Sequence, residues 1–541
     1  MSVEEQQTIA IVAPELPRAG RSAYPGVAGL VAAGTRSGAE DAATYTAAVY
    51  VAQLLLFAAG IVQKRILGPT ATGYWSLMAT FGVFLNLAPL GAVDGAGRQI
   101  PFHRGRGDPS GAAEVADTSS SFGLATTTVA GLVLAGVAIT FGAHWNSDLR
   151  YGLVLLGLCA PLGELRDAHD GIMQATRRFR VTSVVAVAQA AIALTVQTAL
   201  VLLFGYYGMF IGQVLIWLGA LLIWNRAGLT GLARPAFRWR IDPVRLRELI
   251  RFGLPMMLQG QLWALFLAID NLIVAAFLNV RELGFYALAC SATTYIMLLP
   301  RGIGGVIGPR MAERFGATRD AGLIGRYGAE AQRLLAYVLV PVLVAAAFYL
   351  MPVLIRHGLP AFAPAIGVLR IMVAGSFFIS LTTMPIKVLL TSGYRWSVTA
   401  VTLVALALNG VANYVAVGVL HDGLRGAAVA VAVSYFTAFA LMTGFAQSRT
   451  ESAWRAARTV LEMAGAFAYL TGALWGIELL IGHSAPGLVA DSLLALLKLL
   501  LLIVALTPWM WFVEIRCKGM TVLWALAAGA GANVVKRRRD G

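Results

Sequence analysis

Two stretches of the sequence repeat each other at an offset of 211 residues, and no gap is needed to align them. The aromatic pair Tyr74-Trp75 corresponds to Phe285-Tyr286. The identical positions are Leu67, Gly73, Leu77, Pro89, Gly91 and Gly97, which recur as Leu278, Gly284, Leu288, Pro300, Gly302 and Gly308. A duplicated unit in a strongly apolar chain indicates a membrane transporter made of two related halves, with its site between them.

The composition predicts an all-α polytopic membrane protein. Of the 541 residues, 58% are hydrophobic and 13% are charged, and the mean hydropathy is +0.73, which is too apolar for a soluble domain. Apolar stretches recur from Ala43 to Val513, and spans of roughly 20 residues give about fourteen transmembrane helices. Their expected centres lie near residues 52, 83, 130, 161, 193, 216, 265, 296, 344, 376, 408, 435, 472 and 502.

The distribution of positive charge predicts the topology, because cytoplasmic loops retain Lys and Arg during insertion. With both termini in the cytoplasm, which requires an even number of helices, few basic residues fall on the outer loops. They are Lys64, Arg65, Arg150, Arg281, Arg356 and Arg425. Topology therefore accounts for the net charge of +15 without a nucleic-acid partner. A basic inner rim that also attracts anionic lipid or a diphosphate headgroup is a compatible alternative.

The repeat also predicts the domain organisation. Its offset contains six expected helices, so the two halves should be related by an axis along the membrane normal. We expect a mobile cytoplasmic tail (1–42), an N-lobe of helices 1–6 (43–224), a basic cytoplasmic linker (225–251), a C-lobe of helices 7–12 (252–446), helices 13 and 14 (447–515) and a basic cytoplasmic tail (516–541). An apolar run at 520–535 is expected at the membrane interface. The scattered cysteines indicate neither a disulfide framework nor a metal site.

Several segments carry a family resemblance. They are Ile66 to Leu77 (ILGPTATGYWSL), Arg251 to Pro255, Ile269 to Ile273, Leu283 to Leu288 and Pro309 to Glu313. In this order they resemble bacterial polysaccharide flippases of the Wzx type. That family belongs to the multidrug/oligosaccharidyl-lipid/polysaccharide exporter superfamily, which also contains the lipid II flippases and the multidrug and toxin extruders.

The resemblance implies a flippase that moves a polyprenyl-diphosphate-linked oligosaccharide from the inner to the outer leaflet of the cytoplasmic membrane by alternating access. It also implies membrane lipids, a polysaccharide polymerase and glycosyltransferases as partners. We expect a monomer without a cofactor. Two alternatives stay open: a multidrug or cation antiporter of the same superfamily, and a membrane glycosyltransferase or ligase. The enzyme is disfavoured because every outer loop is short and no P-loop or nucleophile motif is present.

Ionisable and polar side chains at membrane depth are the candidate substrate ligands, because burying a charge there costs about 2.5–3.5 kcal/mol unless it meets water or a partner. Arg301, beside Pro300, is expected to bind the diphosphate, although a structural pair with Asp270 is an alternative. Arg370 lies several residues inside its expected span and is a second candidate ligand. The amides assigned to the same cavity are Gln53, Asn86, Gln259 and Gln261.

Other residues are candidates for coupling and motion. Asp270 could titrate or bind an ion and thereby couple a gradient to transport, or simply tie helices together. Pro89 and Pro300, at equivalent places in the repeat, predict paired kinks that act as hinges. Lys498 could face a lipid groove or pair with Glu478. The charged run from Glu164 to Asp170 either projects into the cytoplasm or forms a polar inner vestibule.

Overall fold

The computed structural model describes residues 36–227 and 238–517, with side chains for 47–226, 238–508 and 511. Within these ranges every regular element is helical. Most of the expected N-terminal tail, the middle of the linker, and the C-terminal tail from residue 518, with the apolar run at 520–535, lie outside the described residues.

Helices follow one another across the bundle with short connections. The N-lobe consists of α3 (Arg36–Leu85), α4 (Ala92–Gly105), α5 (Pro109–Phe141), α6 (Ser147–Ala175), α7 (Phe179–Ile192), α8 (Thr198–Phe204) and α9 (Tyr206–Ala227). The C-lobe consists of α10 (Pro243–Phe266), α11 (Ile269–Phe277), α12 (Val280–Thr318), α13 (Ala321–Leu334), α14 (Val340–Gly358), α15 (Ala365–Leu381), α16 (Thr383–Thr391), α17 (Arg395–Asn413) and α18 (Gly423–Thr450). Two further helices, α19 (Ala453–Ile481) and α20 (Leu488–Cys517), complete the described chain.

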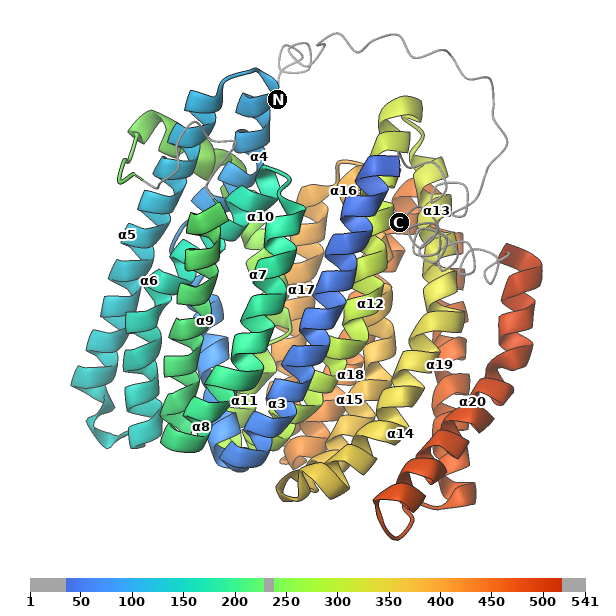
Figure 1. The fold of residues 1–541 in the computed structure, drawn as a ribbon. Helices are drawn as coiled ribbons and strands as arrows, with labels where there is room; N and C mark the ends of the chain where they lie inside the picture. The colour runs from blue at the N-terminus through green and yellow to red at the C-terminus, as the bar shows by residue number, and fades with distance from the viewer. Residues whose placement is uncertain (1–35, 228–237, 518–541) are drawn as a thin grey trace, which may run out of the picture.

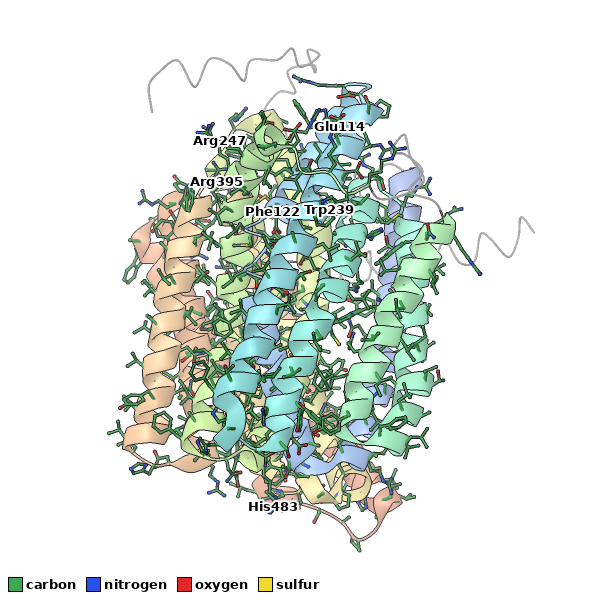
Figure 2. All side chains as sticks on the ribbon, turned by 90° about the vertical axis from the view of Figure 1, so that its left-hand side faces the viewer. Glu114, Phe122, Trp239, Arg247, Arg395 and His483 are labelled. Atoms are coloured by element: carbon green, nitrogen blue, oxygen red, sulfur yellow. The ribbon has the colours of Figure 1, made fainter. Side chains whose placement is uncertain are left out.

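The expected number of crossings is confirmed. Twelve of the described helices are long and apolar enough to span a membrane. One of them, α3, contains two crossings because the backbone turns at Gly68 (φ 71°, ψ −179°), and α6 crosses alongside α5, which gives fourteen. The first and last described helices begin and end at the same end of the bundle (Figure 1), as an even number requires. We call this the basic end; Arg247 and Arg395 lie there, and His483 lies at the opposite end (Figure 2).

Helix 3 of the bundle, α5, shows how the local sequence sets a helix start. Asp108 is its N-cap, Pro109 occupies the first helical position, and the Asp108 carboxylate accepts the Gly111 N–H at 2.8 Å. Together with hydrogen bonds from Ser110 and His103, this backbone N–H lowers the pKa of Asp108 to about 2. A carboxylate is favoured there because the first N–H groups of a helix have no partner within it.

The two lobes meet along two seams that differ in construction. In the continuous seam, helix 1 (47–67 of α3) packs along α12, and both helices are unbroken. In the broken seam, helix 2 (the end of α3 followed by α4) packs against α10 and α11. Both partners there are interrupted. Helix 2 is interrupted between Asn86 and Gly91, and helix 7, which consists of α10 followed by α11, is interrupted at Leu267 and Ala268.

The two prolines for which the repeat predicts equivalent kinks lie in different backbone surroundings. Pro89 lies within the break of helix 2, where Leu90 (φ 50°) and Gly91 (φ 78°) both adopt left-handed backbone. Its repeat mate Pro300 lies inside α12, which remains helical from Val280 to Thr318. A proline removes one backbone hydrogen bond from a helix, and only beside the left-handed pair does the chain leave the helix. The second interruption of the helical backbone lies instead in helix 7, which faces helix 2 across the broken seam.

Glycines of the repeat bring the lobes into backbone contact about a pseudo-two-fold axis. A Cβ added at Gly73 would lie 1.9 Å from the carbonyl oxygen of Val280, and one added at Gly284 would lie 1.9 Å from that of Pro69. Pro69 and Val280 are themselves related by the repeat offset, as are the two glycines. The contact is therefore the same one made twice, which explains why glycine recurs at this position.

We predict that Gly73→Ala and Gly284→Ala each destabilise the folded protein by about 1–3 kcal/mol or more, because the new methyl group meets a backbone carbonyl that cannot rotate away. Gly97→Ala is the matched control, since open space surrounds that repeat glycine. Thermal unfolding of the purified protein in detergent measures the effect. Equal melting temperatures for all three variants would contradict the pseudo-two-fold contact.

Candidate functional site

Arg301 lies in the middle of α12 and keeps an exposed side chain. Its guanidinium lies 4.0 Å from the Met297 sulfur, which is its nearest hydrogen-bond acceptor. The guanidinium also interacts electrostatically with Tyr435 of α18. No ion pair links it to a carboxylate within the part of the chain whose side chains are described, so the expected alternative of a pair with Asp270 is not formed. The next residue, Gly302, faces the Tyr50 hydroxyl of helix 1. The guanidinium is thus a charge beside the continuous seam.

Asp270 lies in the first turn of α11, directly after the break in helix 7, and is only 2% exposed. The Tyr286 hydroxyl donates a hydrogen bond to its Oδ2. Its other oxygen, Oδ1, has no hydrogen-bond donor among the described residues. A buried carboxylate oxygen without a partner is costly, and a bound cation or a proton would relieve that cost.

Buried amides lie on the helices around this carboxylate. Asn271 donates to Thr80 at 3.1 Å across the broken seam, and Asn409 of α17 donates to the Phe266 carbonyl at 2.8 Å. Asn413 in turn donates to the Asn409 side-chain oxygen at 2.8 Å. The Oδ1 atoms of Asn271 and Asn413, like that of Asp270, lack a donor among the described residues. Oxygen acceptors of this kind are the ligands that hard cations prefer.

The face of helix 1 that carries the predicted residue Gln53 forms part of the continuous seam. Phe57 packs edge-on against Tyr295 of α12, with ring centroids 4.9 Å apart, and the Lys64 ammonium donates to the Ser291 hydroxyl at 3.3 Å. Gln53 lies on the same helix face, half-buried. In helix 7, Gln259 and Gln261 are half-buried too, and the Gln261 carbonyl oxygen has no donor among the described residues.

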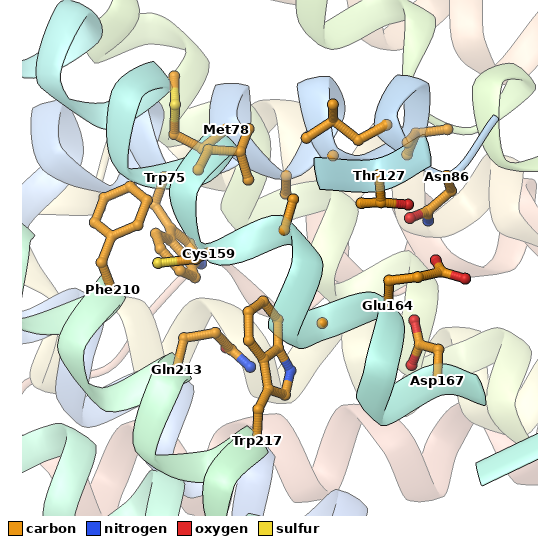
Figure 3. Close-up of a pocket in the computed structure, with 17 residues that line it drawn as sticks. Trp75, Met78, Asn86, Thr127, Cys159, Glu164, Asp167, Phe210, Gln213 and Trp217 are labelled. Atoms are coloured by element: carbon orange, nitrogen blue, oxygen red, sulfur yellow. The ribbon is translucent and has the colours of Figure 1, made fainter. Parts of the chain in front are cut away.

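The N-lobe contains a cavity of about 300 Å³ between α3, α5, α6 and α9 (Figure 3). Asn86, predicted from the sequence, lies at its polar end with Thr127, Glu164 and Asp167, so part of the charged run Glu164 to Asp170 lines an internal space. The opposite end is aromatic and is formed by Trp75 and Phe210, and Trp217 lies between the two ends. Sequence reasoning missed the aromatic residues as a group because they come from different helices, and only Trp75 belonged to a recognised motif.

Arg370 does not join Arg301. Its guanidinium donates to Glu478 of α19 and lies over the Phe348 ring at 5.1 Å. Glu478, 1% exposed, also accepts from Lys498 of α20 at 2.8 Å, which confirms the expected pair. The depth of Arg370 in the apolar span is therefore explained by a buried ion network that attaches α19 and α20 to the C-lobe, and substrate contact is not needed to account for it.

A second ion pair attaches α20 at the same end of the bundle. Asp491, 1% exposed, accepts two hydrogen bonds at 2.9 Å from Arg356 of α14, and His357 lies at 3.1 Å. Bidentate arginine to carboxylate contacts fix geometry as well as charge. The two added helices are thus bound to the C-lobe by buried charges as well as by apolar packing.

The fold and the seams define a two-lobed, multi-pass membrane transporter, and comparisons with known proteins agree. The inward-facing conformation of a multidrug resistance MATE family transporter matches with a TM-score of 0.61 at 14% identity, over 76% of this chain and 96% of that chain. The outward-facing conformation of a multidrug resistance MATE family transporter matches with a TM-score of 0.57 at 13% identity, over 79% of this chain and 98% of that chain. The lipid II flippase MurJ in an inward-closed conformation matches with a TM-score of 0.59 at 12% identity, over 85% of this chain and 97% of that chain.

These identities show a shared fold. A sequence profile for the family described as "Polysaccharide biosynthesis protein" matches residues 63–356, more than half of the chain, and the chain therefore belongs to that family. No curated protein matches it significantly. This match confirms the resemblance to polysaccharide flippases that the segment from Ile66 to Leu77 first indicated.

We predict that Glu478→Leu destabilises the protein by about 3–5 kcal/mol, because it leaves the buried Lys498 ammonium without its carboxylate. The double variant Glu478→Leu/Lys498→Leu should recover part of that loss, because the Arg370 guanidinium then remains without its carboxylate. Arg455→Gln, which removes an exposed pair with Glu451, should cost less than about 1 kcal/mol. Thermal unfolding checks all three, and a double variant no more stable than Glu478→Leu would show that the buried pair is not the cause.

Proposed function

We propose that this protein moves a polyprenyl-diphosphate-linked oligosaccharide from the inner to the outer leaflet of the cytoplasmic membrane for the export of a cell-surface polysaccharide. The single observation that carries the proposal is the exposed Arg301 guanidinium, which has no ion-pair partner among the described residues and lies beside a seam between two lobes of a polysaccharide biosynthesis family member. A diphosphate needs cationic hydrogen-bond donors. A lipid-linked headgroup also needs a route between helices that leaves its tail in the bilayer.

The basic end is assigned to the cytoplasm in this proposal, since positive residues are retained on that side during insertion. Both described ends of the chain then face inward. Alternating access requires the seams to separate in turn. The breaks at Pro89 and at Leu267-Ala268 are the proposed hinges, because backbone outside a helix can change direction without breaking further helical hydrogen bonds.

The test is deletion of the gene followed by analysis of membrane lipids. We expect a polyprenyl-diphosphate-linked glycan to accumulate and the corresponding surface polysaccharide to disappear. That lipid, once purified, is the substrate for assays in proteoliposomes. Unchanged lipid-linked sugars together with increased sensitivity to cationic drugs would overturn the proposal and favour the multidrug antiporter.

We predict that Arg301→Ala lowers the rate of translocation about 10- to 100-fold, as expected for a lost charge-assisted hydrogen bond of about 1.5–3 kcal/mol. Arg301→Lys should retain part of the activity, because an ammonium keeps the charge but not the planar fork. Arg425→Ala, at an exposed arginine where α18 begins, is the control and should leave transport unchanged. Full transport by Arg301→Ala in folded protein would exclude the diphosphate role.

Asp270 is the proposed coupling group, because its Oδ1 atom and the amide oxygen of the adjacent Asn271 both lack a hydrogen-bond donor among the described residues. We predict that Asp270→Asn, which can still accept from Tyr286, removes the acceleration of transport by a sodium or proton gradient. Each gradient is imposed separately on proteoliposomes. Glu313→Gln, at an exposed carboxylate of α12, is the control. Gradient-dependent transport that persists in Asp270→Asn would assign Asp270 to a structural role.

A further inference from the structure

The N-lobe cavity has two chemically distinct ends (Figure 3). Carboxylate, amide and hydroxyl groups of Asn86, Thr127, Glu164 and Asp167 gather at one end, and aromatic rings occupy the other. Its volume of about 300 Å³ is at the lower limit of ligand pockets, about 300–1,000 Å³. One ring of a small polar molecule therefore suits it better than a whole oligosaccharide.

Two polar groups at the polar end lack protein partners. The Glu164 carboxylate is 9% exposed, has neither a hydrogen bond nor an ion pair among the described residues, and interacts electrostatically with two other carboxylates, Asp167 and Asp94. Thr127, 3% exposed, has a hydroxyl without a partner in the same part of the chain. Asp167 is already bound by Arg166. Buried polar groups are normally paired, so Glu164 and Thr127 are available to a ligand.

Glycines make room for two of the side chains that line the cavity. A Cβ added at Gly123 would lie 2.5 Å from the Glu164 carboxylate, and one added at Gly163 would lie 3.1 Å from the Trp217 ring. Trp75 is held edge-on by Phe210, with ring centroids 5.2 Å apart. The carboxylate and the indole rings are therefore positioned by the backbone and by neighbouring rings.

We infer that this cavity binds one sugar ring of the lipid-linked glycan, which rests on the proposed function. A sugar presents C–H groups on its faces, which pack against indole rings, and hydroxyls on its edge, which donate to carboxylates and exchange hydrogen bonds with amides. The neutral groups Asn86, Thr127 and Gln213 provide the donors and acceptors that a polyol needs. The carboxylates repel a diphosphate, so the charged part of the headgroup stays with Arg301 in the other lobe.

The cavity is placed where an occupant can act on the lobes. Asn86 begins the break in helix 2, which ends at Gly91, and Gly91 lies against the backbone of Gly253 in α10. A sugar held at Asn86 therefore lies a few residues from the tightest contact of the broken seam. Occupancy of the N-lobe cavity is thereby linked to closure of that seam.

Gly82 offers a way to fill the cavity. It lines the space and has no atoms within 4 Å of an added Cβ, so Gly82→Leu should block the cavity without a clash. Gly136→Leu is the matched control on exposed α5 surface, where an added Cβ also meets nothing. Trp217→Leu removes the aromatic wall and provides a second, independent variant.

The experiment is saturation-transfer NMR on the full-length protein in detergent, with methyl glycosides of glucose, galactose, mannose and N-acetylglucosamine as probes. We expect signal on the ring C–H protons of at least one glycoside. It should be retained in Gly136→Leu and lost in Gly82→Leu and Trp217→Leu. Absence of signal for every glycoside, equal signal in the blocked variants, or binding of tetraphenylphosphonium alone would overturn the inference.

Translocation of the purified lipid-linked glycan, measured in parallel, separates this inference from the proposed function. If the wild type and Gly82→Leu translocate it equally, the sugar site is wrong and the flippase stands. If the wild type binds glycosides in the cavity yet translocates no lipid-linked glycan, the flippase is wrong and the sugar site stands. Loss of translocation in Gly82→Leu alone, with Gly136→Leu active, supports both.

Discussion

Backbone contact between the lobes at glycine is the constraint on which the rest of the structure depends. Gly73 and Gly284 place helix 2 and α12 against each other's carbonyl groups at one end of the bundle, and Gly91 meets Gly253 in α10 further along helix 2. Contacts without side chains allow two large lobes to approach closely with little apolar driving force, since lipid competes for apolar surface.

Charge is divided between the lobes. The exposed guanidinium of Arg301 and the buried carboxylate of Asp270 belong to the C-lobe, whereas the N-lobe cavity carries Glu164 and Asp167. In the proposed function, this division places the anionic diphosphate at Arg301 and a neutral sugar ring in the N-lobe cavity. The division also explains why the repeat, which fixes the helices, does not extend to the ionisable positions: Asp270 and Arg301 correspond to Ala59 and Leu90.

Sequence reasoning found the fold because hydropathy, charge distribution and the repeat all depend on local composition and on the membrane. It placed Arg301 and Asp270 correctly on their helices but could not determine their partners, since pairing depends on helix rotation. Arg370 illustrates the limit: its depth in the span was evident, but its bond to Glu478, 108 residues away, was not. The cavity in the N-lobe depends on four helices at once and carries no linear motif.

The two seams differ in the unit that must move when each one opens. Helix 1 and α12 are unbroken, so the continuous seam between them separates only if each helix tilts as a whole. Along the other seam, α4 and α10 can part on one side of the breaks while Asn271 remains bound to Thr80 on the other. The two parts of that second seam can therefore open one after the other, which divides one large barrier to separation of the lobes into two smaller ones.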